Sequence, residues 1–189
     1  MTSADGGSGA DAAAGRVVSV NTSTVTGVKK EPRLSVELAV DHGVAGDAHA
    51  GPWHRQVSLL AEESIERMRA CGADVSAGAF GENVTTCGVV VHELPLGTRL
   101  RLGSCLVEVT QIGKECHDRC AIFHQVGDCV MPREGIFVRV LRGGSLRPGD
   151  EVRVLGVETR VAQEGDAPGD GAAVHDDGGR TDGDGLVET

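Results

Sequence analysis

Hydrophobic and polar residues alternate over much of the middle of the chain, which is the period of a β-strand with one buried face. This alternation predicts strands over residues 16–21, 35–40, 99–102, 105–111, 135–142 and 151–157. A helical period occurs at 62–70, where Ile65 and Met68 are three residues apart and Gly72 follows as a stop. Many short strands with few helices favour a mainly β fold, a closed or partly closed barrel, because closure removes exposed strand edges.

The two ends of the 189-residue chain differ from its middle in composition. Residues 1–15 and 161–189 are rich in Gly, Asp and Ala and contain few large apolar side chains. Such segments bury too little surface to offset the entropy lost on ordering, so we predict a disordered N-terminal tail and a disordered acidic C-terminal tail. Residues 16–160 then form one domain, which is long enough for a hydrophobic core.

Most of the net charge of −10 lies in the predicted tails. Residues 161–189 hold eight acids and one base, residues 1–15 hold two acids, and the predicted domain is left with about −1. A nearly neutral domain argues against a broad nucleic-acid-binding surface. The chain has no run of eighteen apolar residues and no basic, apolar leader, so we expect no membrane span and a cytoplasmic protein.

The densest group of reactive side chains lies between residues 113 and 135. Its cysteines are Cys116, Cys120 and Cys129, and its imidazole and cations are His117, Lys114, Arg119 and Arg133. Neighbouring cations favour the thiolate, the form that attacks electrophiles and binds soft metals, and a cytoplasmic protein keeps its thiols reduced. The three isolated cysteines, Cys71, Cys87 and Cys105, are predicted to be small buried hydrophobic residues.

Three interpretations of this cysteine cluster stay open on the residues alone. Cys116, His117, Cys120 and Cys129 are possible ligands of a structural zinc ion, although their spacing is not that of a repeated CxxC pair. A single thiolate among cations is suited to attack or to ligate something soft. Ordinary loop cysteines without a chemical role are the third interpretation.

Several motifs, taken in order, resemble the MOSC domain, which is named for the C-terminal part of molybdenum cofactor sulfurases. They are GDAHAG at 46–51, RQVSLL at 55–60, GENVTT at 81–86, the pair Arg119-Cys120 and VLRGG at 140–144. The resemblance covers residues 16–157. It implies a strand-rich barrel that binds molybdenum cofactor (molybdopterin), with one family cysteine that carries sulfur or ligates molybdenum. Cys120 matches that cysteine.

The resemblance also implies the composition of the site. Cys120 is the expected metal ligand and catalytic thiolate, with His117 and Cys116 beside it. The phosphate of the cofactor needs cations, and its pterin needs hydrogen-bonding partners. The candidate cofactor-binding residues are Lys114, Arg119, Arg55, Arg133, Glu82, Asn83, His49 and His54. Either of the last two could also donate a proton near the metal, since histidine titrates near neutral pH.

Three functions follow as hypotheses. The first is a stand-alone protein that binds molybdenum cofactor through Cys120 and handles sulfur or the cofactor during maturation, with the cofactor or its sulfur donor as partner. The second is a molybdenum-dependent reductase of N-hydroxylated substrates, with electrons from an external flavin or iron–sulfur protein. The third is a zinc-binding or interaction module without catalysis. We expect no bound pyridoxal phosphate, because this chain lacks the aminotransferase-like domain that carries it in sulfurases.

Overall fold

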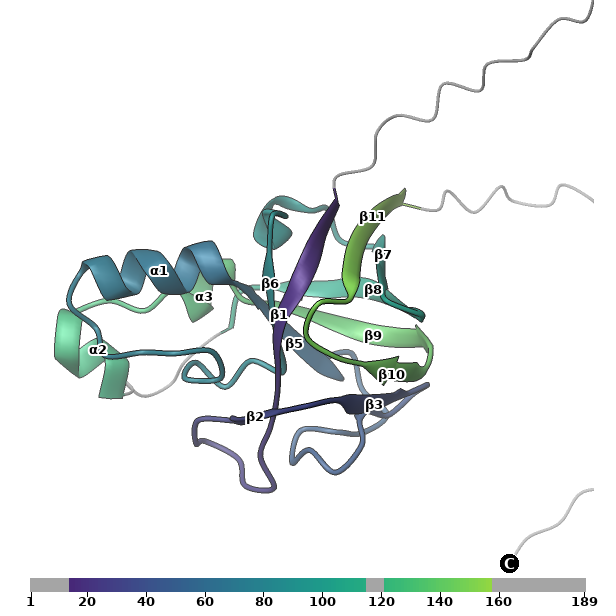
Figure 1. Cartoon of the computed structure of the whole chain (residues 1–189), viewed down its shortest axis with the longest axis horizontal. Coiled ribbons are helices and arrows are strands. Elements are labelled where there is room, and N and C mark those ends of the chain that lie inside the picture. Colours follow the sequence, from purple (N-terminus) through teal and green to yellow (C-terminus); the bar gives the residue numbers. More distant parts are fainter. Residues whose placement is uncertain (1–13, 115–120, 158–189) are drawn as a thin grey trace, which may run out of the picture. The chain divides into compact units, whose positions relative to one another are not determined.

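Seven strands form a closed barrel in the computed structural model, which describes residues 14–114 and 121–157. In chain order they are β1 (Ala14–Thr22), β5 (Val57–Ala61), β6 (Val84–Cys87), β7 (Thr98–Leu102), β8 (Cys105–Ile112), β9 (Ile136–Arg142) and β11 (Glu151–Val157). They follow one another in the order β11-β7-β8-β9-β5-β6-β1, and β1 pairs with β11 to close the ring (Figure 1). The predicted mainly β fold with a closed barrel is confirmed.

The remaining elements lie around this ring. β2 (Glu31–Arg33) pairs with the end of β1, and β10 (Gly144–Leu146), β3 (Val36–Ala39) and β4 (Gly43–Val44) form a three-stranded sheet. The helices are α1 (Glu62–Ala70), α2 (Ala121–Val126) and α3 (Met131–Glu134), with a 3₁₀ turn at Val91–Glu93. Figure 1 shows the three α-helices together on one side of the barrel. No helix in the described ranges is long and apolar enough to cross a membrane.

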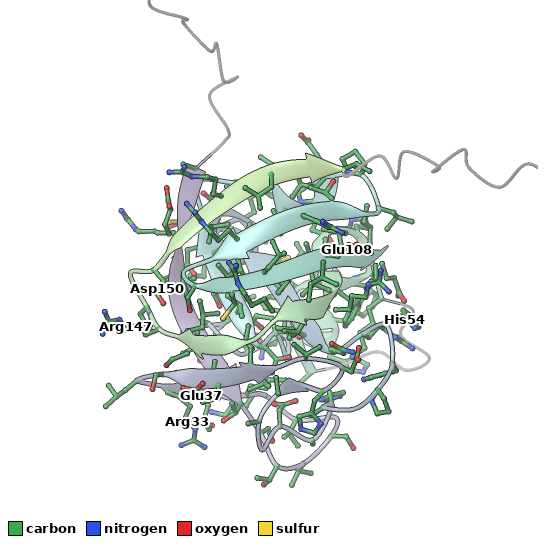
Figure 2. The ribbon with its side chains drawn as sticks, turned by 90° about the vertical axis from the view of Figure 1, so that its right-hand side faces the viewer. Arg33, Glu37, His54, Glu108, Arg147 and Asp150 are labelled. Carbon is green, nitrogen blue, oxygen red and sulfur yellow. The ribbon has the colours of Figure 1, made fainter. Side chains whose placement is uncertain are left out.

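The barrel interior is filled by the inward side chains of alternating strands. On β8, Cys105, Val107 and Val109 are buried, while Glu108 points outward on the face seen in Figure 2. β5 differs, because Leu59 packs in the barrel interior and Leu60 packs in a second apolar cluster with residues of α1, α2 and α3. Both faces of β5 are therefore covered, and all five of its residues are buried.

The periodic elements match the predictions within one or two residues at each end. The helix at 62–70 and the strand at 151–157 have the predicted bounds. β5 has no alternation because both of its faces are buried, β6 has only four residues, and periodicity predicted neither strand. Ala14 and Gly15, which were assigned to the N-terminal tail, belong to β1 and pair with β11. The rest of both predicted tails lies outside the described residues. Residues 158–160, which were assigned to the domain, also lie outside them.

The three isolated cysteines occupy three different environments. Cys105 is buried in the barrel as predicted, and Cys87 is half-buried at the end of β6. The prediction is wrong for Cys71, which is exposed. Cys71 directly follows the last turn of α1, where the chain turns away at Gly72 with a positive φ of 94°, so it leaves the face that Ile65 and Met68 bury.

Removal of a core side chain from β5 should destabilise the barrel much more than the same change at the surface. Leu59 is fully buried, so Leu59→Ala should lower the free energy of unfolding by about 2–5 kcal/mol, through lost transfer energy and the cavity left behind. The matched control is Leu34→Ala, because Leu34 is 94% exposed and its loss should change stability little. Urea unfolding followed by circular dichroism measures both, and equal midpoints would contradict the inward placement of Leu59.

Candidate functional site

A cavity of about 970 Å³ opens on the outer side of strands β5 and β9. Ser58 and Phe137 line it from these strands, while their neighbours Val57, Leu59 and Val138 pack inside the barrel. The other lining residues come from segments far apart in the sequence: 27–29, 49–55, 74–83, Lys114, the start of α2, Cys129 and Met131. The barrel wall is therefore also the floor of the cavity.

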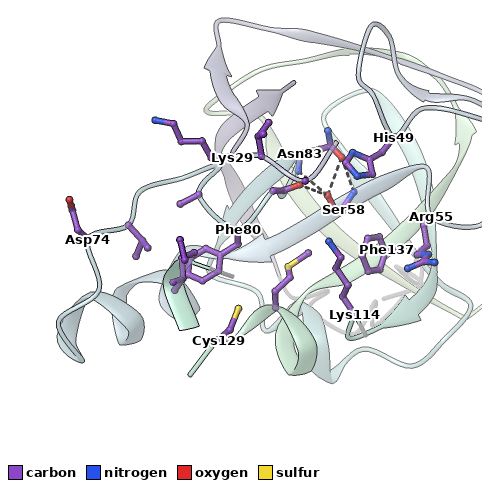
Figure 3. A pocket seen from close by; sticks show the side chains of 18 of the residues that line it. Lys29, His49, Arg55, Ser58, Asp74, Phe80, Asn83, Lys114, Cys129 and Phe137 are labelled. Atoms are coloured by element: carbon purple, nitrogen blue, oxygen red, sulfur yellow. Dashed lines mark hydrogen bonds between the residues drawn. The ribbon is translucent and has the colours of Figure 1, made fainter. Parts of the chain in front are cut away.

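Polar and apolar side chains line the cavity at both ends. In Figure 3, His49, Arg55, Lys114 and Phe137 lie toward one end, which we call the polar end, and Phe80, Asp74 and Lys29 lie toward the other. Further apolar lining residues are Val28, Val75, Ala79, Ile122 and Met131. The cavity can thus hold a ligand that has a charged or hydrogen-bonding part and a flat or apolar part.

A buried ion pair supports the polar end. Lys30 Nζ lies 2.5 Å from both carboxylate oxygens of Asp47, and the two side chains are only 1% and 2% exposed. Asp47 also accepts hydrogen bonds from the backbone N–H groups of Ser23 and His49, at 3.1 and 3.0 Å. The carboxylate therefore fixes Lys30 and the His49 loop at one point.

The His49 ring connects this ion pair to the cavity. Its Nδ1 lies 3.3 Å from Lys30 Nζ and 3.5 Å from Asp47 Oδ1, and the side chain is about one-third exposed. His49 is also a lining residue, so one imidazole contacts both the buried pair and the open space. A ring nitrogen in this position can exchange a proton with the ammonium behind it.

Burial and hydrogen bonding shift the pKa values of Lys30 and Asp47 in opposite directions. Burial lowers the pKa of Lys30 below its usual value, although the hydrogen bonds and charge of Asp47 oppose that shift. Burial would raise the pKa of Asp47, but hydrogen bonds from His49, Lys30 and Ser23 outweigh it and hold that pKa well below its usual value. Asp47 stays ionised, and Lys30 gives up its proton more readily than a surface lysine.

A second polar network joins β5, β6 and β1 beside the cavity. The Asn83 side-chain oxygen accepts hydrogen bonds from the backbone N–H and the hydroxyl of Ser58, at 3.2 and 3.0 Å. The Asn83 amide donates to the backbone oxygen of Asn21 at 3.2 Å. Asn83 lines the cavity, as the prediction of a cofactor-binding residue requires, and its rotamer is fixed by these bonds.

Glu82 lies behind the wall rather than in it. Its carboxylate is fully buried and accepts hydrogen bonds from the backbone N–H groups of Gly78 and Phe80 and from the Thr85 hydroxyl, at 2.5, 3.2 and 3.0 Å. Burial raises the pKa of this carboxyl, and the hydrogen bonds oppose the shift. Glu82 is not among the described lining residues, so the structure gives it the role of holding the 78–81 turn, which places Phe80 in the cavity.

Arg55 is held between two aromatic rings. Its guanidinium carbon lies 5.0 Å from the Trp53 ring centre and 5.5 Å from the Phe137 ring centre. Its Nε is buried and has no hydrogen-bond partner among the described residues. A buried donor without a partner is costly, and an oriented guanidinium suits phosphate or carboxylate oxygens. Arg55, which lines the cavity together with Lys114, is therefore ready for an anion.

The other predicted site residues are distributed differently. His54 is hydrogen-bonded to Gln111 at 3.0 Å, and Arg133 forms an exposed bidentate pair with Asp128 at 2.7 and 2.9 Å. Neither His54 nor Arg133 is among the described lining residues, so of the two loop histidines His49 is the one that faces the cavity. Cys116, His117, Arg119 and Cys120 lie outside the described residues. Cys129, a member of the predicted cysteine cluster that was not among the candidate cofactor-binding residues, lines the cavity.

The zinc interpretation stays a prediction. Within residues 14–114 and 121–157, no group of three His, Cys, Asp or Glu side chains is arranged to hold a metal ion. A zinc site would therefore need Cys116, His117 or Cys120, which the structure does not describe.

Sequence reasoning missed several residues of the candidate site. Lys29 and Lys30 are adjacent in the sequence, but Lys29 is 73% exposed whereas Lys30 is buried. Phe80, Met131 and Phe137 are spread over more than fifty residues, and no local pattern assigns them to one cavity. In an extended segment, successive side chains point to opposite sides, so one of two adjacent lysines can point inward. That alternation was the available signal for the burial of Lys30.

Comparison with known proteins identifies the family. A model of the MOSC domain matches residues 46–153, more than half of the chain. The chain belongs to the MOSC domain family. The matched range includes Asp47, His49, Arg55 and Asn83, whereas Lys30 precedes it.

The chain is also similar to proteins of known sequence or structure. The chain is 27% identical over 141 residues to the uncharacterized protein YflK of Bacillus subtilis, which covers 69% of this chain and 63% of that protein. The match thus spans less than two thirds of the length of that relative. Solved structures share the fold: YuaD from Bacillus subtilis has a TM-score of 0.64 at 16% identity, covering 76% of this chain and 97% of YuaD. YiiM from Geobacillus stearothermophilus has a TM-score of 0.56 at 25% identity, covering 78% and 77%.

Loss of the Asp47 charge should strongly destabilise this MOSC domain. Asp47→Asn leaves the Lys30 ammonium buried without its counter-ion, so the free energy of unfolding should fall by about 3–5 kcal/mol at pH 7. The matched control is Asp128→Asn, whose ion pair with Arg133 is more than half exposed and should contribute little to stability. Denaturant unfolding at pH 7 compares the two, and similar losses would contradict a structural role for the buried pair.

The same variant should have a characteristic pH dependence. Because folding lowers the pKa of Asp47, its stabilisation is fully present above the unfolded-state pKa of about 3.9 and is lost as the pH falls below it. The stability difference between the wild type and Asp47→Asn should therefore narrow between pH 5 and pH 2, the window in which we would measure unfolding. A difference that stays constant over this window would rule out a contribution from Asp47 ionisation.

Proposed function

We propose that the cavity of this MOSC domain binds molybdenum cofactor. The observation that carries the proposal is Arg55, a guanidinium oriented by two aromatic rings with a buried Nε that lacks a partner in the described residues. Arg55 and Lys114 would hold the phosphate, because charge-assisted hydrogen bonds to phosphate are strong. Ser58 and Asn83 would hydrogen-bond to the pterin. The residues present therefore fit the group that the family is associated with.

The thiolate that we assign to the metal is that of Cys120. Lys114 and Ala121, the described residues on either side of the segment that carries it, both line the cavity. A thiolate is a soft ligand that matches a soft molybdenum centre, which the cofactor would supply for sulfur transfer or redox chemistry. In this role the protein handles sulfur or the cofactor during maturation, with the cofactor or its sulfur donor as partner.

Cofactor content tests this proposal. Protein produced in a host that makes molybdenum cofactor should contain bound molybdenum and pterin, and Cys120→Ser should lose most of the molybdenum. Elemental analysis and pterin fluorescence measure the two, with Cys71→Ser as the control because Cys71 is exposed at the end of α1. Equal molybdenum content in all three proteins would refute ligation by Cys120, and zinc in place of molybdenum would support the metal-binding module instead.

A second candidate function, a reductase of N-hydroxylated substrates, is favoured by the contacts of His49. Removal of the hydroxyl oxygen as water breaks an N–O bond and consumes two protons and two electrons. His49 can donate a proton at the cavity wall and regain one from Lys30, whose ammonium lies 3.3 Å from its Nδ1 and is kept in place by Asp47. The electrons would come from an external flavin or iron–sulfur protein.

Replacement of the imidazole separates the two candidates. His49→Gln keeps a polar side chain but cannot carry a proton, so kcat for reduction of an N-hydroxylated purine should fall about 10²- to 10⁴-fold while molybdenum content stays unchanged. The assay supplies electrons from reduced methyl viologen, and a strain lacking the gene is tested for sensitivity to hydroxylaminopurine. Unchanged kcat in His49→Gln would exclude a proton-transfer role, and unchanged strain sensitivity would favour the maturation role.

A further inference from the structure

The outer face of strands β11, β7, β8 and β9 carries an excess of arginine. These strands are turned toward the viewer in Figure 2. The charged residues on them, all half-buried or exposed, are Arg153, Arg101, Arg99, Arg139 and Arg142 against the acids Glu108 and Glu151. The described residues as a whole hold fifteen bases and fifteen acids, so their charge is balanced. A face with five bases and two acids is therefore a local concentration of positive charge, which we call the arginine face.

The arrangement on this face is repeated. Glu108 lies between Arg99 and Arg139, at 3.8 and 2.8 Å, and Glu151 lies between Arg101 and Arg153, at 3.1 and 2.6 Å. Each carboxylate thus contacts two guanidinium groups and forms a trio with them, and arginines outnumber acids in both trios.

Stability alone does not account for this arrangement. Arg101 and Arg153 are direct cross-strand partners, and like charges in that position are unfavourable. Glu108 is 18% exposed and Glu151 is 42% exposed, and ion pairs with these two acids do not require more arginines than acids on the face. The positive charge is thus better explained by something that binds to the face from outside.

The arginine face leads to the cavity along β9. Arg139 and Phe137 are two positions apart on the outward side of this strand, so their Cα atoms are separated by about 7 Å. Phe137 lines the cavity and contacts the Arg55 guanidinium. A protein bound on the face would therefore have its edge close to the polar end of the cavity.

We propose that the arginine face is the docking surface for a small acidic electron-transfer protein. This inference rests on the second candidate function, in which two electrons must reach the cavity from outside the chain. Electron-transfer encounters bury little surface and depend on complementary charge, which sets their rate and orientation. The overall charge of −10 does not prevent an acidic protein from binding, since screening at physiological salt limits charge interactions to about 8 Å. The charge of the arginine face itself therefore determines the electrostatic attraction.

Flavodoxin, a small acidic flavin protein, is the probe for the test. Oxidised flavodoxin should bind the full chain, and binding measured by titration calorimetry should weaken strongly between 50 and 300 mM salt. The double variant Arg101→Gln/Arg139→Gln removes one arginine from each trio and should bind at least about tenfold more weakly. The control Arg67→Gln/Arg69→Gln removes the same charge from α1, on the other side of the barrel, and should bind like the wild type.

Two results would overturn the docking proposal. The first is that the wild type and the arginine-face variant have equal affinity for flavodoxin, which includes the case in which neither protein binds it. The other is a face-dependent affinity for a DNA duplex without affinity for flavodoxin, which would assign the surface to nucleic acid. The assay needs no bound molybdenum, so its outcome is separate from that of the proposed function. If flavodoxin binds to the arginine face but the protein never contains the cofactor, the docking proposal is supported and the reductase function is refuted.

Discussion

The buried contact between Lys30 and Asp47 determines the geometry of the polar end of the cavity. Two charges at 1–2% exposure are tolerated in a protein interior only when each satisfies the other and the remaining hydrogen bonds are made, as they are here by Ser23 and His49. The pair ties the segment before β2 to the loop after β4. The position of His49, and with it any proton chemistry at the cavity, follows from that constraint.

The barrel provides the rigidity that such a site needs. β5 and β9 have one face in the barrel core and the other in the cavity or under the helices, so the backbone at Ser58 or Phe137 cannot shift without disturbing the core. The buried side chains of Asn83 and Glu82 accept hydrogen bonds from the Ser58 hydroxyl and the Gly78 backbone N–H, and these bonds fix the turn at 78–83. Functional side chains on strands with two packed faces are held more precisely than side chains on loops.

The membership of the MOSC family and the chemistry of the cavity agree on the kind of ligand. Cations, an amide group and aromatic or aliphatic side chains line one cavity, and these are the groups that the proposed ligand, a phosphorylated pterin, needs. The contact of His49 with Lys30 and the arginine face are separate features of the structure. The proposed proton transfer rests on the first and the proposed docking of an electron donor rests on the second.

The amino-acid sequence by itself determined the elements whose two faces differ, because a half-buried strand or helix must show a period of two or about 3.6. It therefore predicted the strand at 151–157, the helix at 62–70 and the barrel class, and its motifs indicated the family and the residues His49, Arg55, Asn83 and Lys114. Only the tertiary structure decided that Lys30 is buried and that Glu82 supports the wall instead of lining it. Those properties arise from contacts between segments that are distant along the chain, such as the ion pair of Lys30 with Asp47. The local sequence around a side chain does not determine which distant charged residue it will contact.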